Sequence, residues 1–206
     1  MTILQLLESA RYDIRDTAKS DYTDPEIFEY FKRALSHLEE SLSAIESDLV
    51  SSNDTITLSS GSNYISTPDN CIVVTEVWQG QNKLVPLTPM RKIYYERKVK
   101  SSNQAPYYWC EQGDTIQFDA TADQDYDINV YFDKATDLSN LTMVSDVPYS
   151  PRFDNALRQA VILQCKHRNE FGVGEDGALL TFFKQVVLGK EFFKRNVPYH
   201  GRKLDF

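Results

Sequence analysis

The apolar residues between Thr23 and Val50 recur at alternating steps of three and four positions. The members of this series are Phe28, Phe31, Leu35, Leu38, Leu42, Ile45 and Leu49. On an α-helix, such spacing places all of these side chains on one face. The pattern therefore predicts one helix, about 40 Å long, whose apolar seam forms the core of a helical bundle.

The residues before this seam carry signals for the start of a helix. Either Asp24 is the N-cap with Pro25 at the first helical position, or Thr23 forms a capping box with Glu26. Both interpretations begin the helix within one residue of Thr23.

Further stretches with apolar residues at helical spacing lie on both sides of the central region. One helix is predicted over residues 2–17, with Thr2 as its cap and a turn at 19–22 that makes it antiparallel to the long helix. Ser150-Pro151 opens a third helix that Gly172 closes, and a fourth runs from about Asp176 to the stop at Pro198. These four helices can bury their apolar faces together.

Between residues 51 and 137 the pattern changes to the alternation typical of β-strands. The expected strands are 55–58, 72–78, 83–87, 107–112, 115–119 and 126–132, and a short helix is expected over 90–99. Gly80-Gln81-Asn82 predicts a hairpin, and Pro86 and Pro89 restrict its second arm to a sheet edge or strand end. The alternation also predicts one shared core for Ile116, Phe118, Ile128, Val130 and Phe132.

The predicted fold is α+β, a helical bundle interrupted by a small antiparallel β module and followed by an extended C-terminal tail. The expected parts are residues 1–50 with the N-terminal helices, 51–137 with the β module, 138–196 with a connection and the C-terminal helices, and 197–206 as the tail. The ends of an inserted module commonly lie close together, which lets the two helix pairs meet.

Composition narrows the functional classes. The net charge of −8 over 206 residues argues against general nucleic-acid binding, and no apolar run approaches the length of a membrane span. Asp13 and Arg15 interrupt the N-terminal apolar residues, so no signal peptide is expected. Three scattered cysteines predict a reducing compartment. Residues 1–55 are acidic and 184–206 are basic, which suits ends that meet different partners or copies of the chain.

Candidate catalytic chemistry is sparse. The three histidines lack metal-ligand spacing, and the glycines at 172, 174 and 177 lack the lysine and serine or threonine of a phosphate loop. The aspartates between 119 and 127 fit a solvated turn better than a calcium loop. The aromatic run at 107–109 fits a core or subunit contact better than a ligand platform. We expect no cofactor, no metal and no enzymatic activity.

The order of these elements resembles the head-to-tail adaptor (connector) proteins of tailed bacteriophages. The resemblance rests on Asp21-Tyr22-Thr23-Asp24-Pro25-Glu26 before the long helix, Pro106-Tyr107-Tyr108-Trp109, Gly113-Asp114-Thr115-Ile116-Gln117-Phe118, Tyr126-Asp127-Ile128-Asn129-Val130-Tyr131-Phe132, Asp133-Lys134-Ala135-Thr136-Asp137-Leu138-Ser139, Val147-Pro148 and Phe153. Together these segments extend over most of residues 1–195.

The resemblance implies a structural virion protein, a dodecameric ring that docks beneath the portal protein and carries a tail or nozzle protein below. DNA would pass through its channel without specific binding, and no membrane is involved. In such adaptors the C-terminal extension typically reaches the portal. The residues assigned to the portal or subunit interface are therefore Arg195, Tyr199, Arg202, Lys203, Leu204 and Phe206.

Two other classes stay open from the sequence. The β module could bind a sugar or peptide, in which case Tyr107, Trp109 and Trp78 would be exposed. An enzyme of unnamed class is the third alternative, and no acid/base or metal constellation supports it.

Overall fold

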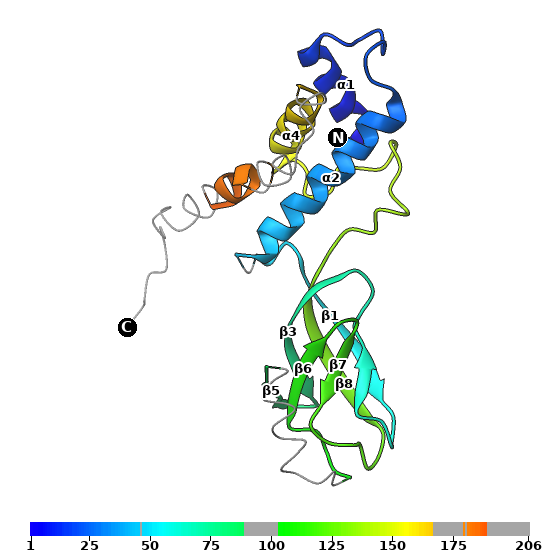
Figure 1. The fold of residues 1–206 in the computed structure, drawn as a ribbon, viewed down its shortest axis with the longest axis vertical. Helices are drawn as coiled ribbons and strands as arrows, with labels where there is room; N and C mark the ends of the chain where they lie inside the picture. Colours follow the sequence, from blue (N-terminus) through cyan, green and yellow to red (C-terminus); the bar gives the residue numbers. More distant parts are fainter. Residues whose placement is uncertain (46, 89–102, 167–178, 180, 189–206) are drawn as a thin grey trace, which may run out of the picture. The chain divides into compact units, whose positions relative to one another are not determined.

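The computed structural model describes residues 1–45, 47–88, 103–166, 179 and 181–188. The chain divides into two compact units, a helical unit of Met1–Leu49 with Thr136–Phe206 and a β module of Val50–Ala135 (Figure 1). The predicted helix over 90–99, the stop at Gly172 and the C-terminal tail lie outside the described residues.

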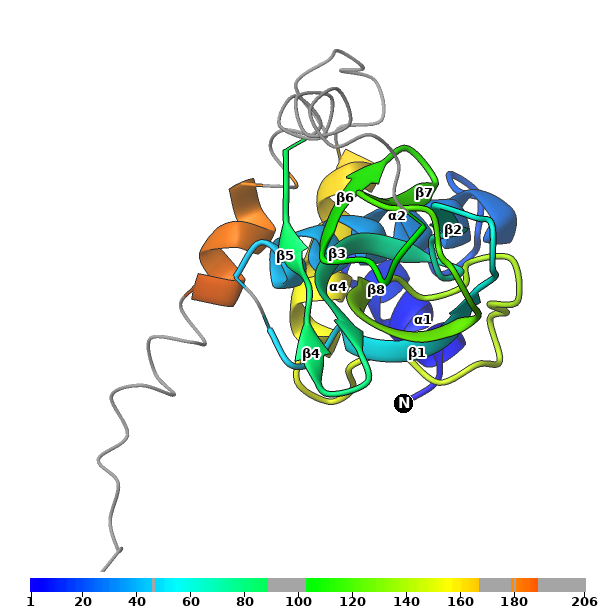
Figure 2. The same cartoon turned by 90° about the horizontal axis from the view of Figure 1, so that it is seen from below.

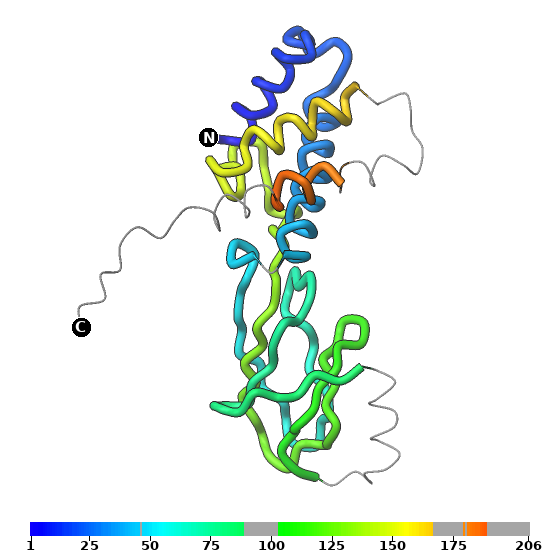
Figure 3. Tube along the Cα trace, turned by 90° about the vertical axis from the view of Figure 1, so that its left-hand side faces the viewer, coloured from blue at the N-terminus to red at the C-terminus, as the bar shows by residue number. Residues whose placement is uncertain are grey.

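The helical unit contains α1 (Ile3–Ile14), α2 (Asp24–Ser43), α4 (Asp154–Lys166) and a helical stretch at 181–188. Helix α4 lies against both α1 and α2 (Figure 3). The shared core is apolar, and its largest fully buried side chains are Ile3, Leu6, Leu7, Ile27, Phe31, Leu35, Leu38, Leu42, Phe153 and Phe183.

The helix starts follow the sequence signals. The Thr2 hydroxyl accepts a hydrogen bond from the Gln5 amide, and the Gln5 side chain accepts one from the Thr2 amide, which makes a capping box. At α2 the N-cap is Thr23, whose hydroxyl accepts from the Glu26 amide, so Thr23 and not Asp24 caps the helix.

Three predicted helix boundaries are wrong. Helix α1 ends at Ile14 rather than at residue 17, because Arg15 adopts a left-handed backbone conformation that closes the helix. Helix α2 ends at Ser43 rather than continuing to Val50, because the Leu42 carbonyl accepts the amides of Ile45 and Ser47 and turns the chain. The third helix begins at Asp154 rather than at Ser150-Pro151, a cis peptide bond within a turn.

The connection before α4 is anchored on the start of α1. The amide of Ile3 donates to the Ser145 carbonyl at 2.9 Å, and the Val147 amide donates to the Met1 carbonyl at 3.0 Å. A segment without regular periodicity therefore gains order from backbone hydrogen bonds, which the sequence pattern does not reveal.

The β module contains two four-stranded sheets, ordered β1-β8-β3-β4 and β2-β7-β6-β5. Their strands are β1 (Ser51–Leu58), β2 (Tyr64–Ser66), β3 (Cys71–Gln79), β4 (Asn82–Lys83), β5 (Val85–Pro86), β6 (Tyr108–Gln112), β7 (Thr115–Phe118) and β8 (Tyr126–Lys134). Strands β4 and β5 follow one another along one extended stretch, which carries the chain from the first sheet to the second (Figure 2).

The core of the β module confirms the predicted alternation. Ile116, Phe118, Ile128, Val130 and Phe132 are all buried in one apolar cluster. Its other large members come from β1, β2, β3, β6 and the residue between β4 and β5, and they are Leu58, Ile65, Val74, Val77, Leu84 and Trp109.

The module departs from the prediction in three details. Strand β1 begins at Ser51 rather than at residue 55. Strand β2 was not expected, because its three residues are too few to show alternation. The second sheet is mixed rather than antiparallel, since β5 pairs with β6 in parallel. The expectation for Pro86 is confirmed, because β5 is an edge strand.

Candidate interfaces

The residues predicted to contact the portal or a neighbouring subunit, Arg195, Tyr199, Arg202, Lys203, Leu204 and Phe206, all lie outside the described residues. The residues of the predicted bundle seam differ in burial. Phe31, Leu35, Leu38 and Leu42 are buried in the helical unit, and Phe28 and Ile45 are half-buried. Leu49, beyond the end of α2, is 38 % exposed, so its place in the predicted bundle core is wrong.

The turn between α1 and α2 is built around a buried ion pair. Arg11 Nη1 donates to Asp16 Oδ2 at 2.6 Å and to the Tyr22 carbonyl at 2.8 Å, while Nη2 donates to Asp24 Oδ1 at 3.0 Å. Arg11 and Asp16 are both almost fully buried. One guanidinium therefore fixes the start of α2 against the end of α1.

The Asp16 carboxylate organises the backbone of this turn. Burial by itself would raise its pKa, but it accepts hydrogen bonds from the amides of Ser20, Asp21 and Tyr22 and lies against Arg11. These interactions favour the charged form, so the pKa of Asp16 lies below its usual range. The stretch that carries the family resemblance, from Asp21 to Glu26, is thus a structural turn.

A second buried carboxylate lies where the chain returns to the helical unit. Glu39 Oε1 accepts hydrogen bonds from the Thr136 amide at 3.0 Å, the Thr136 hydroxyl at 2.5 Å and the Tyr149 hydroxyl at 2.9 Å. Burial raises the pKa of Glu39, and these hydrogen bonds offset part of that effect. The carboxylate joins α2 to two points of the connection, and sequence reasoning missed it because Glu39 reads as a solvated position.

We expect Glu39→Gln to change the pH dependence of stability. Because the folded pKa of Glu39 lies above its ordinary value near 4.5, the folded protein binds this proton more tightly than the unfolded chain. Stability is then lost as pH rises from the unfolded pKa through the raised folded pKa. Glutamine is neutral throughout and keeps an acceptor oxygen, so the variant should lose less stability than the unchanged protein over a window that begins near pH 4.5.

Urea unfolding at several pH values measures this difference. The Glu40→Gln variant, altered at a neighbouring partly exposed carboxylate of the same helix, should keep the slope of the unchanged protein. A Glu39→Gln curve parallel to that of the unchanged protein across the whole window would contradict the assignment.

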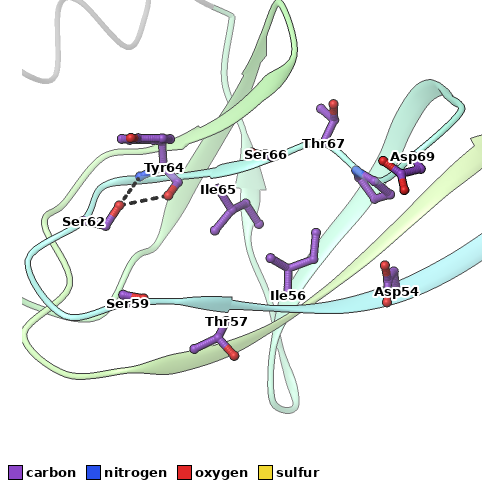
Figure 4. A pocket seen from close by; sticks show the side chains of 11 residues that line it. Asp54, Ile56, Thr57, Ser59, Ser62, Tyr64, Ile65, Ser66, Thr67 and Asp69 are labelled. Atoms are coloured by element: carbon purple, nitrogen blue, oxygen red, sulfur yellow. Dashed lines mark hydrogen bonds between the residues drawn. The ribbon is translucent and has the colours of Figure 1, made fainter.

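An opening in the β module lies between the two edge strands β1 and β2. This hollow has a volume of about 460 Å³ and is lined by Asp54, Ile56, Thr57, Ser59, Ser62, Tyr64, Ile65, Ser66, Thr67, Pro68 and Asp69. Ile56 from β1 and Ile65 from β2 point toward one another across it (Figure 4). Polar and acidic groups surround this apolar floor. We name it the β1–β2 hollow.

The outer face of the first sheet carries an aromatic and charged cluster. The rings of Trp78 and Tyr131 meet edge to face at 6.5 Å, and Lys83 lies 5.9 Å from the centre of the Trp78 ring. Glu76 accepts hydrogen bonds from Trp78 Nε1 and from Lys83, which lowers the pKa of Glu76. The cluster is internally paired and presents Tyr131 with 41 % of its surface exposed.

The aromatic run at 107–109 is divided between surface and core. Tyr107 is exposed, whereas Trp109 is only 6 % exposed and belongs to the core of the module. The amides of Tyr107 and Tyr108 both donate to Asp119 Oδ1, which fixes this stretch. The exposed Trp109 that a ligand platform requires is therefore not present.

The described residues give no sign of catalytic or metal chemistry. Nowhere in the described part of the chain do three His, Cys, Asp or Glu residues gather as metal ligands. The aspartates of the turn before β8 take protein donors instead, since Asp125 accepts from the Ser60 amide and Asp123 from the Tyr126 hydroxyl. Burial, with Glu111 and Asp133 nearby, raises the pKa of the Cys71 thiol to about 11, which makes it a poor nucleophile at neutral pH.

The chain matches the family model described as SU10 adaptor protein over residues 1–185. It belongs to the SU10 adaptor protein family. The match extends across the β module and most of the helical unit, and it confirms the resemblance to head-to-tail adaptors of tailed phages. The search of curated proteins found no match.

Membership of the SU10 adaptor family makes this chain a structural protein of a phage virion, and it implies association with portal and tail proteins. A structural adaptor agrees with the expectation that the protein is not an enzyme. Among the helices the structure describes, none has the length and apolarity needed to cross a membrane.

Proposed function

We propose that this SU10 adaptor forms a ring of identical copies, a dodecamer, that docks beneath the portal and links the DNA-filled head to the tail. The observation that carries the proposal is the family match over residues 1–185, which includes both units. The portal protein is the partner above, and a tail or nozzle protein is the partner below. The subunit is made in the host cytoplasm and incorporated into the virion.

The channel of such a ring suits an acidic protein. A net charge of −8 repels DNA, so the strand passes without specific binding. In this proposal the helices of residues 1–50 and 138–196 form one bundle, the module at 51–137 is inserted between them in the sequence, and the tail at 197–206 makes intersubunit or portal contacts. Packing of α4 against both α1 and α2 supports the bundle.

Removal of residues 197–206 tests the role of the tail. The truncated subunit should keep its fold, because the buried apolar side chains of the described residues, the last of which is Val187, all lie before the deleted segment. It should lose most of its docking, because it lacks the basic Arg202 and Lys203 and the apolar Tyr199, Leu204 and Phe206, which together with the retained Arg195 are the proposed contacts. Cosedimentation with the purified portal measures docking, and circular dichroism checks the fold.

A full-length variant with Arg202→Glu and Lys203→Glu is the matched control, since it keeps the chain length and reverses only the charge. It should dock more weakly than the unchanged protein. In vivo, particles carrying the truncated subunit should leak packaged DNA or fail to accept a tail. Docking at unchanged affinity by the truncated subunit, together with normal infectious particles, would contradict this role of the tail.

A further inference from the structure

Strand β1 has a free backbone edge whose open positions follow from the register. Lys134 N donates to the Val50 carbonyl at 2.8 Å, and Ser51 pairs with Asp133. Hydrogen-bonded pairs alternate in an antiparallel ladder, so residues 52, 54, 56 and 58 bond to β8. The backbone groups of Ser51, Asn53, Thr55 and Thr57 therefore point away from the sheet.

The two edges beside the β1–β2 hollow are protected to different degrees. On β2 the outward amide and carbonyl of Tyr64 are both bonded to the Ser62 hydroxyl (Figure 4). On β1 the Asp54 carboxylate accepts the Thr55 amide at 2.8 Å. Within the described residues, the outward groups of Asn53 and Thr57 have no such partner. Strand β1 is therefore the edge that can accept another strand.

The hollow beside this edge favours a particular composition in the added strand. Side chains on one face of that strand would enter between the sheets, onto Ile56 and Ile65, with Asp54 and Asp69 at the rim. The described residues of the module carry ten acidic side chains against two basic ones, Lys83 and Lys134. The matching strand combines apolar and basic residues at alternate positions.

The C-terminal sequence of the chain has this composition. Arg202, Leu204 and Phe206 alternate with Lys203 and Asp205, so that in an extended conformation one face carries a guanidinium and two apolar side chains. We propose that residues 199–206 of a neighbouring copy add to β1 as an extra strand, with Leu204 and Phe206 in the β1–β2 hollow. This rests on the proposed function in that it names the neighbouring subunit as a partner of the tail.

The proposed ion pair between Arg202 of the incoming strand and Asp54 explains how the edge of β1 becomes available. A guanidinium gives the Asp54 carboxylate a charge-assisted partner that is stronger than the neutral Thr55 amide. Arg202 at the rim draws the carboxylate off the edge and frees this amide for the incoming strand. Asp54 therefore guards the edge in the isolated subunit and contributes to binding in the complex.

A labelled peptide of residues 197–206 tests the site on the protein truncated after Asn196. Fluorescence anisotropy should show saturable binding, and amide exchange should slow at Asn53, Thr55 and Thr57. Thr57→Pro removes one outward amide while leaving the bonds to β8, and Ile56→Asp makes the floor polar; each should weaken binding at least about tenfold. Thr57→Ala keeps the amide and should bind as the unchanged protein does.

Asp54→Lys reverses a charge at an exposed position outside the apolar core, so this variant should fold as the unchanged protein does. It should also weaken peptide binding at least about tenfold. The truncated protein retains residues 89–102, a segment of the module with five basic side chains. This segment is the alternative occupant of the β1–β2 hollow. If that segment fills the hollow, the peptide will not bind, and the proposal is overturned.

Complementary variants decide whether a neighbouring copy supplies the strand. The truncated protein keeps the binding site but has no tail to donate. Full-length Asp54→Lys can donate its tail but should not bind one. Sedimentation should show each as a monomer alone and a one-to-one dimer on mixing. Peptide binding without such a dimer would overturn the assignment to a neighbour. Portal docking that is lost on truncation, with no peptide binding, would overturn this inference and leave the proposed adaptor function intact.

Discussion

Replacing Arg11 with alanine is expected to lower the free energy of unfolding by about 3–5 kcal/mol, the usual cost of removing one partner of a buried ion pair. The substitution leaves the Asp16 carboxylate, whose side chain is fully buried, without its countercharge. It also removes the donor to the Tyr22 carbonyl and to Asp24. Chemical denaturation at neutral pH measures the loss.

Lys32→Ala is the matched control, because Lys32 forms an ion pair with the exposed Glu29. Its cost should stay within about 0–1 kcal/mol. The pH dependence gives a second check. The lowered pKa of Asp16 contributes stability that is present above its unfolded value near 3.8 and lost as pH falls toward the folded value. Equal stability losses for the two variants at pH 7 would show that the buried pair contributes no more than a surface contact.

Leu38→Ala is expected to cost about 2–5 kcal/mol, the range for truncating a buried leucine and leaving a cavity. Leu38 is fully buried in the middle of α2, within a core to which α1 and α4 also contribute. Because core side chains around it are close-packed, the structure can relax only in part into the space left behind. Urea unfolding, analysed with a common slope, measures the change.

Leu49→Ala compares the same substitution at a position that shares the heptad spacing but is 38 % exposed. Its cost should be below about 1 kcal/mol, since little apolar surface returns to water. A Leu38→Ala loss below about 0.5 kcal/mol would show that the seam of α2 is not core. Comparing the two substitutions thus shows whether the loss of stability follows the burial of the leucine or only its place in the heptad spacing.

Helix existence was predictable from the sequence, while helix ends were less so. The steps of three and four from Phe31 to Leu42 coincide with burial because a helix this long has one face toward its partners. The same spacing at Ile45 and Leu49 is accidental, since the Leu42 carbonyl already closes the helix. Periodicity records which face is apolar, and it does not record where backbone hydrogen bonds end.

The β module shows a similar division. Alternation in β7 and β8 identified the core residues, because each strand buries one face. The parallel pairing of β5 with β6 depends on where the chain goes after Leu84, which no local pattern specifies. Strand β2 is too short to show alternation in the sequence and is held as a strand by its pairing with β7.

The roles of individual acidic residues were the least predictable from the sequence. Glu39 has a partner 97 positions away, at Thr136. The partners of Asp16 lie in the adjacent turn and at Arg11, and the place of Asp54 on the sheet edge follows from strand register. Tyr107 and Trp109 belong to the same aromatic run in the sequence, yet Tyr107 is exposed and Trp109 is buried. The family resemblance identified the class of protein because it depends on the order of elements rather than on any one contact.

The hydrogen bond from Lys134 to the Val50 carbonyl also bears on how the module is joined to the rest of the chain. It links the two ends of the module's outer ladder, so the chain enters and leaves the module at adjacent backbone positions. Because these ends lie side by side, we expect that a module of different length but the same end-to-end spacing can be inserted here without displacing the ends of the flanking segments.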